Sequence, residues 1–545
     1  MRVALAQINP TVGDLAGNRR LIEQAAARAA AARADLVVVP ELALCGYPPL
    51  DLVERDGFVR DQLRELDALA AASGDVAIVV GAVLETEPRD GKRLVNAAVM
   101  LRGGARVAIQ AKTHLPTYDV FDEKRYFAPA EKRRAIELPG AAVGLTVCED
   151  GWVDRIGYFA DPTGELAKSG AELVLNLSAS PWHLGKPAEL RRIFCDLAAK
   201  HSVPIAFCNQ VGGNDELIFH GGSFVADARG RVLAALPLFE PAFTVVDVEH
   251  ASGVAPDAVE EPERIAQLEA ALVLGIRDYF RKQGLPLGAV IGLSGGVDSA
   301  VTAQLAVEAL GREQVTGVAM PGPFSSDHSI EDAHALAKNL GIAIRTVDIK
   351  PIYESYRRVF AELFGAKNDY GLAQQNIQSR IRGATLMAIS NAENRLVLAT
   401  GNKSELSMGY CTLYGDTVGG LAVIGDVYKR DVYALARHAN RPREIIPWRT
   451  IDKPPSAELA PGQKDSDDLP DYAVLDAVLE QAIEGERAAP LVTPPAGSTR
   501  ETIAGIVRRI DRNEYKRRQA PLVLRVSPKA FGSGRKLPIV HRYQL

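Results

Sequence analysis

The stretch Ala289 to Ser299, AVIGLSGGVDS, constrains the fold of this chain more than any other. A short apolar run typical of a buried strand stops at Ser294 and two glycines, and an apolar segment with helical spacing begins at Asp298. The glycines leave backbone N–H groups uncovered, the serines add hydroxyls, and the positive N-terminus of the helix would face the turn. The stretch therefore predicts a strand, an anion-binding turn and a helix. For two adjacent glycines alone, a tight turn without a ligand is the alternative.

The complete hexapeptide 294–299, SGGVDS, favours the anion site. It resembles the pyrophosphate loop of the N-type ATP pyrophosphatases, which split ATP into AMP and pyrophosphate to adenylate a carboxylate or carbonyl. The sequence holds no GxxxxGK[ST] stretch that would compete with it. The resemblance implies that ATP is bound by this loop, namely by Gly292, Leu293, Ser294, Gly295, Gly296, Val297, Asp298 and Ser299.

Size and composition indicate a globular protein with two domains. The chain has 545 residues, of which 47% are hydrophobic and 24% charged, and such a length favours two cores of a few hundred residues each. The net charge of −5 argues against a general nucleic-acid binder, so small molecules are the expected partners. We expect no membrane association, because no apolar run approaches the ~20 residues that span a bilayer and no signal segment follows Met1.

The cysteines predict a reducing, cytoplasmic environment. They are few, odd in number and without the spacing of metal ligands, so no disulfide framework is expected and at most one thiol is chemically active. The five are Cys45, Cys148, Cys195, Cys208 and Cys411.

The first half of the chain has the alternating pattern of an α/β layered fold. Apolar runs typical of strands alternate with helical stretches, of which Ala25 to Arg33 is an ordinary amphipathic one. The expected strands are Val3 to Ile8, Leu36 to Val39, Val76 to Val83, Val143 to Cys148, Leu173 to Leu177 and Pro204 to Cys208.

Three residues lie where strand-like runs end: Glu41, Lys112 and Cys148. Taken singly, a cysteine there is usually core, and a glutamate or lysine is usually solvated. In their contexts, VVVPELALCGYP, VAIQAKTHLP and VGLTVCEDGW, they together resemble the Glu, Lys, Cys triad of the nitrilase superfamily, which cleaves carbon–nitrogen bonds of amides and nitriles. The resemblance extends over residues 1 to about 250 and implies an α-β-β-α sandwich.

The cleavage of an amide requires these three residue types. Cys148 would attack the carbonyl carbon, Glu41 would take and return the proton, and Lys112 would stabilise the oxyanion. Lys112 favours the Cys148 thiolate whereas Glu41 opposes it, and the sequence leaves the balance open. Glu123, in VFDEKRYF, matches the superfamily's additional glutamate that positions the lysine or substrate, with a charged surface turn as the alternative.

Within this resemblance, Tyr118, Ser180 and Lys186 match positions that hold the α-amino and α-carboxylate groups of glutamine in the glutamine-using members. The substrate implied is L-glutamine. The run NLSASPWHLGK departs from the family's usual loop after its Ser-Pro pair, so a solvated lysine is the alternative for Lys186.

A domain boundary is expected where the alternation fails, in VEHASGVAPDAVEEPER. We predict a first domain at 1–250, a linker at 251–262 and a second domain at 263–545. Beyond the boundary, a helix at Glu263 to Lys282 precedes the loop, and a strand at Val315 to Met320, a helix at Ser329 to Leu340 and a strand at Ala343 to Ile349 follow it. This βαβ repetition predicts a doubly wound parallel sheet with its ligand at the carboxyl ends of the strands.

Later stretches resemble the NAD synthetases: residues 374–391, 398–410, 414–437 and NEYKRRQAP around Lys516. The resemblance assigns Asp298 and Glu405 to Mg²⁺, Thr400 to ATP, and Asn376, Glu405 and Lys516 to deamido-NAD. Two carboxylates suit a hard cation that bridges phosphate oxygens. For Lys516 a solvated, arginine-rich helix is the alternative; a nucleic-acid role is disfavoured because no aromatic residues interleave.

Taken whole, the chain resembles the glutamine-dependent NAD synthetases, in which an amidase domain supplies ammonia to the synthetase. The implied reaction is ATP-dependent amidation of deamido-NAD through an adenylated intermediate. Amidation of another carboxylate by the same chemistry is the nearest alternative, and a non-catalytic first domain is another. The resemblance also implies a homo-oligomer and a mobile loop over the active site at 454–472.

Overall fold

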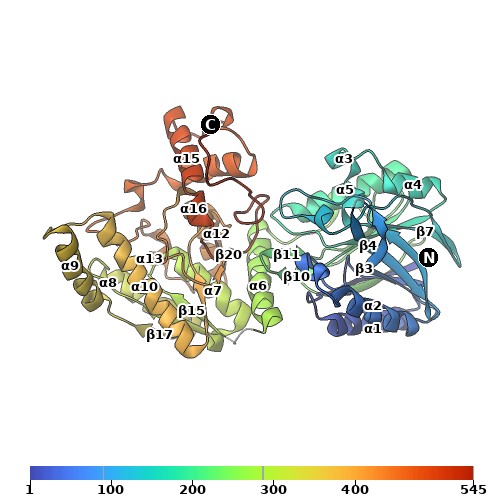
Figure 1. Ribbon diagram of the computed structural model, residues 1–545, viewed down its shortest axis with the longest axis horizontal. Helices are drawn as coiled ribbons and strands as arrows, with labels where there is room; N and C mark the ends of the chain where they lie inside the picture. The colour runs from blue at the N-terminus through green and yellow to red at the C-terminus, as the bar shows by residue number, and fades with distance from the viewer. Residues whose placement is uncertain (90, 285–287, 544–545) are drawn as a thin grey trace. The chain divides into compact units, whose positions relative to one another are not determined.

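The computed structural model describes residues 1–89, 91–284 and 288–543. The chain divides into two compact units, Met1–Pro262 and Glu263–Leu545 (Figure 1). Residues 544 and 545, the end of the predicted second domain, lie outside the described residues.

The first unit is built on two six-stranded sheets. The first sheet has the order β14 (Ala242–Asp247), β1 (Arg2–Gln7), β2 (Leu36–Val38), β3 (Ala77–Arg89), β4 (Lys92–Arg102), β5 (Ala105–Ala111). The second has the order β13 (Val232–Ala235), β12 (Phe224–Ala226), β9 (Ile205–Asn209), β8 (Leu173–Ser178), β7 (Ala141–Val147), β6 (Ile136–Leu138). A separate antiparallel pair is formed by β10 (Val211–Asn214) and β11 (Leu217–His220).

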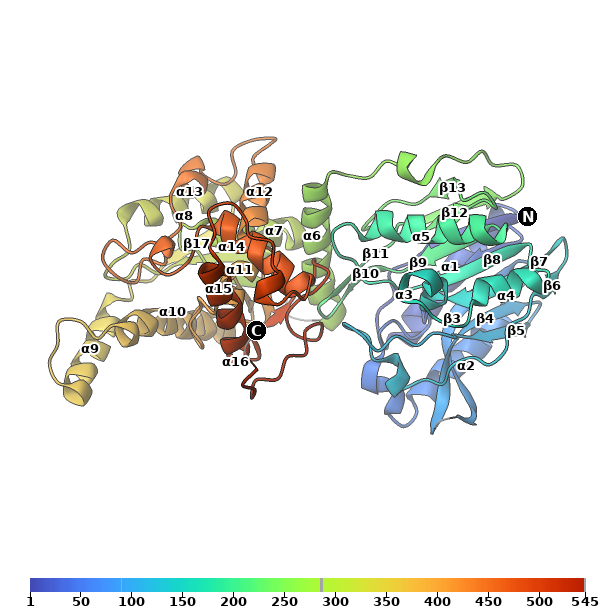
Figure 2. The ribbon, with the colours of Figure 1, turned by 90° about the horizontal axis from the view of Figure 1, so that it is seen from above.

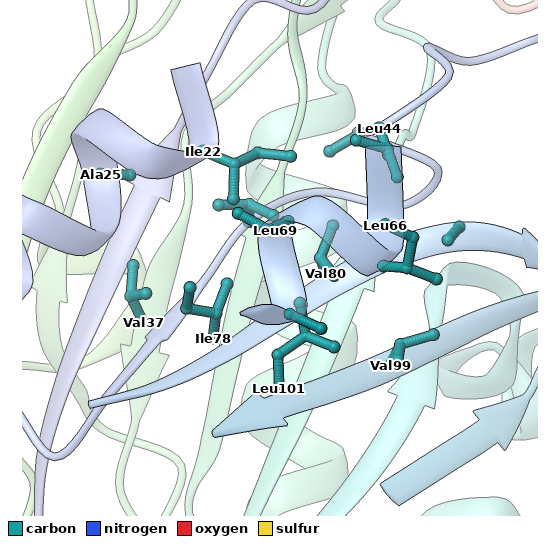
Figure 3. Packing of buried hydrophobic residues seen from close by; sticks show 14 of the residues in the cluster. Ile22, Ala25, Val37, Leu44, Leu66, Leu69, Ile78, Val80, Val99 and Leu101 are labelled. Atoms are coloured by element: carbon teal, nitrogen blue, oxygen red, sulfur yellow. The ribbon is translucent and has the colours of Figure 1, made fainter. Parts of the chain in front are cut away.

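Helices cover one face of each sheet. Helices α1 (Leu15–Ala31) and α2 (Phe58–Ala71) pack on the first sheet, where Ile22, Leu66 and Leu69 meet Val37 and Ile78 (Figure 3). On the second sheet, α4 (Pro162–Lys168) contacts β7, and α5 (Lys186–His201) contacts β9 and β12 (Figure 2). The short helix α3 (Val153–Ile156) follows the end of β7.

The two sheets share a second apolar layer between them. Successive strand residues point to opposite faces, so Ala4 contributes to the core under α1 and α2, whereas Val3 and Leu5 pack with Leu145 and Leu175 of the other sheet. The layers are therefore helix, sheet, sheet, helix, and the predicted α-β-β-α sandwich is confirmed.

The structure contains strands that the apolar runs did not predict. Strand β6 is IEL, an edge strand of the second sheet in which all three side chains are exposed or partly exposed. Strand β3 extends to Arg89, six residues past the predicted end at Val83, because Glu85 pairs with Leu94 in the antiparallel hairpin with β4. Exposed edges and hairpin tips carry polar residues, so an apolar pattern predicts the strands there too short or not at all.

Residues 251–262, predicted as a linker, lie within the first compact unit. The Arg191 side chain on α5 donates to the Pro256 carbonyl at 2.9 Å and to Glu261 at 2.5 Å. Val254 also forms a β-bridge with Val232. This segment is thus held on the surface of the first unit.

The second unit contains a six-stranded sheet in which every pairing is parallel. Its order is β17 (Ala343–Thr346), β16 (Val315–Ala319), β15 (Ala289–Gly292), β18 (Leu396–Ala399), β19 (Leu421–Ala422), β20 (Leu522–Val523). The order reverses direction between β15 and β18, so this is a doubly wound sheet with its switch point there. Ligands of such sheets bind at the carboxyl ends of the strands beside the switch point.

Helices surround this sheet. Helix α7 (Val297–Leu310) contacts β15 and β16, with α6 (Arg264–Gln283) and α12 (Lys429–Ala439) packed against it. Helix α10 (Leu372–Glu393) contacts β15 and β18, and its Ile381 shares a core with Val290. The others are α8 (Asp327–Leu340), α9 (Lys350–Phe364), α11 (Lys403–Met408), α13 (Trp448–Asp452), α14 (Tyr472–Leu479), α15 (Arg500–Arg512) and α16 (Glu514–Arg517). Among the described residues, no helix is long and apolar enough to cross a membrane.

Candidate active sites

In the first unit, the three predicted catalytic residues all follow strand ends. Glu41 lies in the turn after β2, Lys112 comes directly after β5, and Cys148 comes directly after β7. The first two belong to one sheet and Cys148 to the other. Glu41 and Lys112 are buried, and Cys148 is 5% exposed.

The Lys112 ammonium lies between two carboxylates. Its Nζ is 2.7 Å from Glu41 Oε1 and 2.7 Å from Glu123 Oε1. Further donors orient Glu41: Asn96 Nδ2 at 2.6 Å from Oε1, and the Ala179 N–H at 3.1 Å from Oε2. Glu123 is buried beside Lys112 and is therefore not part of a charged surface turn. One ammonium paired with two oriented carboxylates is a preorganised charge cluster.

The electrostatics of the cluster decide the state of the thiol. Burial raises the pKa of Cys148, the Glu41 carboxylate raises it further, and the opposing effect of Lys112 is too small to reverse this, so the pKa of Cys148 lies well above its ordinary value. Burial lowers the pKa of Lys112, but Glu123 and Glu41 outweigh it and raise that pKa well above its usual value. Cys148 is therefore a thiol and Lys112 a cation at neutral pH, so nucleophilic attack by Cys148 would need a base.

Cys148 has a strained backbone conformation. Its φ is +42°, in the left-handed region that non-glycine residues seldom adopt. The residue begins a short 3₁₀ turn, Cys148–Gly151, that ends β7. Such strain persists only where surrounding contacts enforce it, and it is common at reactive side chains.

A buried carboxylate beside the nucleophile was not predicted from the sequence. Glu149 accepts hydrogen bonds at Oε1 from the hydroxyls of Tyr118 and Tyr158, each at 2.9 Å. The Tyr158 ring stacks on His114 with centroids 4.0 Å apart. The acidic residue directly after the cysteine in CEDG was the available signal. Tyr118, predicted to bind glutamine, is thus tied to this carboxylate.

The other two residues predicted to bind glutamine are also held in place. Ser180 is buried, and its N–H donates to Asn209 Oδ1 at 2.9 Å. Lys186 is the first residue of α5; its Nζ lies 3.2 Å from Glu189 Oε2 and 3.9 Å from the centre of the Trp152 ring. The Lys186 side chain is only 12% exposed, so it is not a generic solvated lysine.

The second unit contains a cavity of about 720 Å³ at the carboxyl ends of β15 and β18. Nearly all residues predicted for ATP, metal and deamido-NAD line it: Gly292, Leu293, Ser294, Gly296, Val297, Asp298, Ser299, Asn376, Thr400, Glu405 and Lys516. Gly295 instead supports the loop from behind. Its φ is +76°, and a Cβ there would lie 2.3 Å from the Ser329 carbonyl oxygen.

The loop is closed by its own hydroxyls. Ser299 Oγ accepts from the Ser294 N–H at 3.3 Å and donates to the Gly296 carbonyl at 3.0 Å. The Gly296 N–H donates to Ser294 Oγ at 3.2 Å. These bonds shape a turn at the N-terminus of α7, the position at which a helix attracts anions.

Two carboxylates in the cavity share one ammonium. Lys429 Nζ is 2.6 Å from Asp298 Oδ2 and 3.2 Å from Glu405 Oε1, and Asn402 Nδ2 donates to Asp298 Oδ1 at 2.8 Å. Burial, opposed by Lys429, raises the pKa of Glu405 to about 8. The pKa of Lys429 is lowered by burial but raised more strongly by Asp298 and Glu405. Lys429 was not predicted, although it lies in the stretch 414–437.

The donor set in this cavity fits magnesium in the way that nucleotide enzymes use it. Within the described residues, no group of three or more His, Cys, Asp or Glu side chains is arranged to hold a metal ion. Mg²⁺ normally takes one or two protein carboxylates and completes its shell with substrate phosphates and water. Asp298 and Glu405 provide two carboxylates beside the phosphate-binding loop.

Asn376 and Lys516 are both hydrogen-bonded to the segment after α11. Lys516 Nζ donates to the carbonyls of Gly409 at 2.7 Å and Cys411 at 2.8 Å, and the Thr412 hydroxyl donates to Asn376 Oδ1 at 2.8 Å. Lys516 belongs to the short α16 rather than to one arginine-rich helix with α15, because the helix breaks at Asn513. It is a partly buried residue of the cavity wall.

Residues 453–463, here called the strap, contribute several lining residues that were not predicted individually. Glu458 accepts from the hydroxyls of Ser326 at 2.9 Å and Ser329 at 2.8 Å, and from the Ser326 N–H at 3.2 Å. The strap is pinned by these bonds to the first turn of α8, beside the phosphate-binding loop.

Comparisons with known proteins match each unit to a protein family. The carbon-nitrogen hydrolase family matches residues 2–254, and the NAD synthase family matches residues 268–520. The chain is 45% identical to glutamine-dependent NAD(+) synthetase of Synechocystis sp. over 99% of both chains, and 40% identical to that of Thermotoga maritima over 100% and 99%. The solved structure of the synthetase from Acinetobacter baumannii in complex with ADP is 37% identical, with a TM-score of 0.78 over 99% and 98% of the two chains.

A nitrilase-type amidase site and an ATP-binding doubly wound domain in one chain define a glutamine-dependent amido-ligase. With identities of 38–45% over essentially the full length, the chain belongs to the glutamine-dependent NAD(+) synthetase family.

Proposed function

We propose that this chain converts deamido-NAD to NAD with ATP, using ammonia that its first unit releases from glutamine. The observation that carries the proposal is the buried cluster in which Lys112 bridges Glu41 and Glu123 beside Cys148. A docking or sensing module would have no reason to bury three charges around a thiol, because such burial is destabilising unless it serves chemistry.

The glutaminase half-reaction follows from this geometry. Glu41 takes the thiol proton as Cys148 Sγ forms a bond to the amide carbon, and Lys112 stabilises the oxyanion. Glu41 then gives the proton to the departing nitrogen, so that ammonia leaves and a thioester remains. Water, deprotonated by Glu41, attacks the thioester; glutamate is released and the thiol is restored. Glu123 holds Lys112 in position.

We assign glutamine recognition to side chains that complement the charges of its α-ammonium and α-carboxylate groups. The Glu149 carboxylate, held by Tyr118 and Tyr158, suits the α-ammonium group. The buried Ser180 and the Lys186 ammonium suit the α-carboxylate. Together they would place the side-chain amide at Cys148.

The synthetase half-reaction is assigned to the cavity of the second unit. The loop 292–299 and Thr400 bind ATP, while Asn376, Glu405 and Lys516 bind deamido-NAD. A nicotinate carboxylate oxygen forms a bond to the α-phosphorus as pyrophosphate leaves; ammonia then attacks the acyl carbon and AMP leaves. Asp298 and Glu405 would hold Mg²⁺, which when bound neutralises phosphate charge. Lys429 keeps these two carboxylates together before nucleotide binds.

We further propose that the protein is a cytoplasmic homo-oligomer. All five cysteines are free thiols, which suits a reducing compartment. Helix α9 leaves an apolar stripe exposed at helical spacing, formed by Ile352, Tyr356, Val359 and Leu363, which supports self-association. Sedimentation of the purified chain tests this: a monomer at micromolar concentration would contradict it.

The reaction is tested by product analysis. With deamido-NAD, ATP and glutamine, the products should be NAD, AMP, pyrophosphate and glutamate in equal amounts. A panel of other carboxylates in place of deamido-NAD should give little product. ADP with phosphate would contradict adenylation, and faster amidation of another acid would contradict the substrate.

A further inference from the structure

The catalytic residues of the first unit come from two separate sheets. Lys112 follows β5 of one sheet and Cys148 follows β7 of the other. In the part of the chain that the structure describes, no strand pairing joins the two sheets, so hydrogen-bond ladders do not set the spacing between the two residues. Some other contact must fix it.

One carboxylate bonds to the backbone on both sides. Asp150 Oδ1 accepts from the N–H groups of Thr113 and His114, each at 2.9 Å, and Asp150 Oδ2 accepts from the Val147 N–H at 3.0 Å. Thr113 directly follows Lys112, and Val147 directly precedes Cys148. Asp150 is 1% exposed.

We propose that Asp150 is a positioning residue for the glutaminase reaction, whose carboxylate fixes Lys112 relative to Cys148. The proposal rests on the function proposed for these two residues. Asp150 does not itself contact the substrate. It holds the backbone from which the oxyanion donor and the nucleophile project.

The strained turn explains why a strong acceptor is needed there. Cys148 has a φ of +42°, a strained conformation that persists only under constraint. Asp150 supplies one constraint through the Val147 N–H. Packing supplies another, since a Cβ at Gly151 would lie 2.4 Å from the Phe194 ring. Hydrogen bonds to an ionised acceptor are roughly twice as strong as neutral ones, so a carboxylate is the suitable clamp.

The substitution Asp150→Asn tests positioning separately from folding, because it keeps the size of the side chain. In Asp150→Asn one oxygen becomes an NH₂ group, which cannot accept a hydrogen bond, so the clamp opens on one side and stays closed on the other. The matched control is Asp227→Asn, because Asp227 Oδ1 likewise accepts from two backbone N–H groups, those of Arg229 and Arg231, in the turn after β12.

The experiment measures glutaminase kcat and KM, alkylation of Cys148, ammonium-dependent NAD synthesis and melting temperature in the full-length enzyme. A displacement near 1 Å reduces rates by up to ~10²-fold. We therefore expect Asp150→Asn to lower the glutaminase kcat about 10- to 100-fold, with KM within about threefold of wild type. Alkylation of Cys148 and synthesis from ammonium should persist, and Asp227→Asn should keep its kcat.

Two results would overturn the proposal: a kcat near wild type in folded Asp150→Asn, or equal losses of kcat in the two variants with equal losses of melting temperature. If Asp150→Ala does not fold, Asp150→Asn decides alone. A glutaminase that survives Cys148→Ala would instead refute the proposed function, which distinguishes the two failures.

Discussion

At the scale of single residues, the first unit concentrates its charge in one place. Lys112 is a buried ammonium with two carboxylate partners, Glu41 and Glu123. Removing one partner of such a cluster leaves an uncompensated buried charge, which typically costs 3–5 kcal/mol. The cluster therefore contributes little to stability. Its main effect is to fix the protonation states that amide cleavage needs.

The first prediction concerns the pH dependence of the Cys148 thiol. Its pKa is raised by burial and by Glu41, so the thiolate fraction at neutral pH is small and grows as pH increases. Replacing Glu41 by Gln removes a negative charge and lowers this pKa. Glu41→Gln should therefore alkylate with iodoacetamide several-fold faster than wild type at pH 8, while its glutaminase activity is lost.

Peptide mapping by mass spectrometry assigns the label to Cys148, with Cys148→Ala as the blank. The buried Cys45 and Cys208 should stay unlabelled in the folded protein. Slower alkylation in Glu41→Gln than in wild type would contradict the electrostatic assignment.

The second prediction concerns Asp298. Its carboxylate pairs with Lys429 and accepts from Asn402. Asp298→Asn should reduce NAD synthesis by about 10²-fold or more with either glutamine or ammonium as nitrogen donor, because Lys429 and the proposed Mg²⁺ would each lose a carboxylate partner. Asp327→Asn, an acidic residue in the first turn of α8, is the matched control and should stay near wild type. A defect confined to glutamine would place Asp298 outside the synthetase site.

At the scale of elements, the ends of two strands form the proposed nucleotide site. The order of the parallel sheet reverses between β15 and β18, and the loops after these strands carry Ser294, Gly296 and Thr400. The strand, turn and helix predicted from the sequence are confirmed here, because one hexapeptide encodes strand end, turn and helix start within a few residues. The sequence of the loop and the switch point of the sheet thus indicate the same position for a ligand.

The third prediction tests the support of that loop. In Gly295→Ala, the new Cβ would lie 2.3 Å from the Ser329 carbonyl oxygen, and φ is +76°. The loop must shift, so NAD synthesis should fall at least about tenfold with either donor. Gly311→Ala controls for backbone strain, because φ there is +87° and nothing lies within 4 Å of the added Cβ. Equal activities in the two variants would show that the contact with α8 is unimportant.

The fourth prediction concerns the strap, residues 453–463. Glu458 pins it to α8 through three hydrogen bonds. Glu458→Ala should release the strap and speed tryptic cleavage at Lys464 several-fold, because cleavage needs a locally opened chain. Glu486→Ala, which removes an exposed glutamate bound to Lys529, is the control. Unchanged cleavage in Glu458→Ala would show that other contacts hold the strap.

At the scale of the whole molecule, sequence patterns identified local features better than distant contacts. Glu41, Lys112 and Cys148 were predicted because each ends a strand-like run and their local contexts together resemble the nitrilase triad. The sequence did not predict roles for Lys429, Asp150 and Glu458, because each hydrogen-bonds to a segment that is distant along the chain. The separations are 131, 37 and 129 positions, respectively. The direction of the pKa shift of Cys148 could not be predicted either, because it depends on burial, which a sequence pattern does not give. The edge strand β6 was missed because its exposure removes the apolar signal.

The central claim is that one chain has two active sites, of which the first only supplies ammonia. The most direct measurement compares NAD formation by wild type and Cys148→Ala from glutamine and from ammonium chloride, at saturating ATP and deamido-NAD. Cys148→Ala should lose NAD formation from glutamine and keep it from ammonium, because the proposed role of Cys148 is confined to the amide-cleaving step. Loss of activity with both donors in a variant that melts like wild type, or retention with both, would contradict the account.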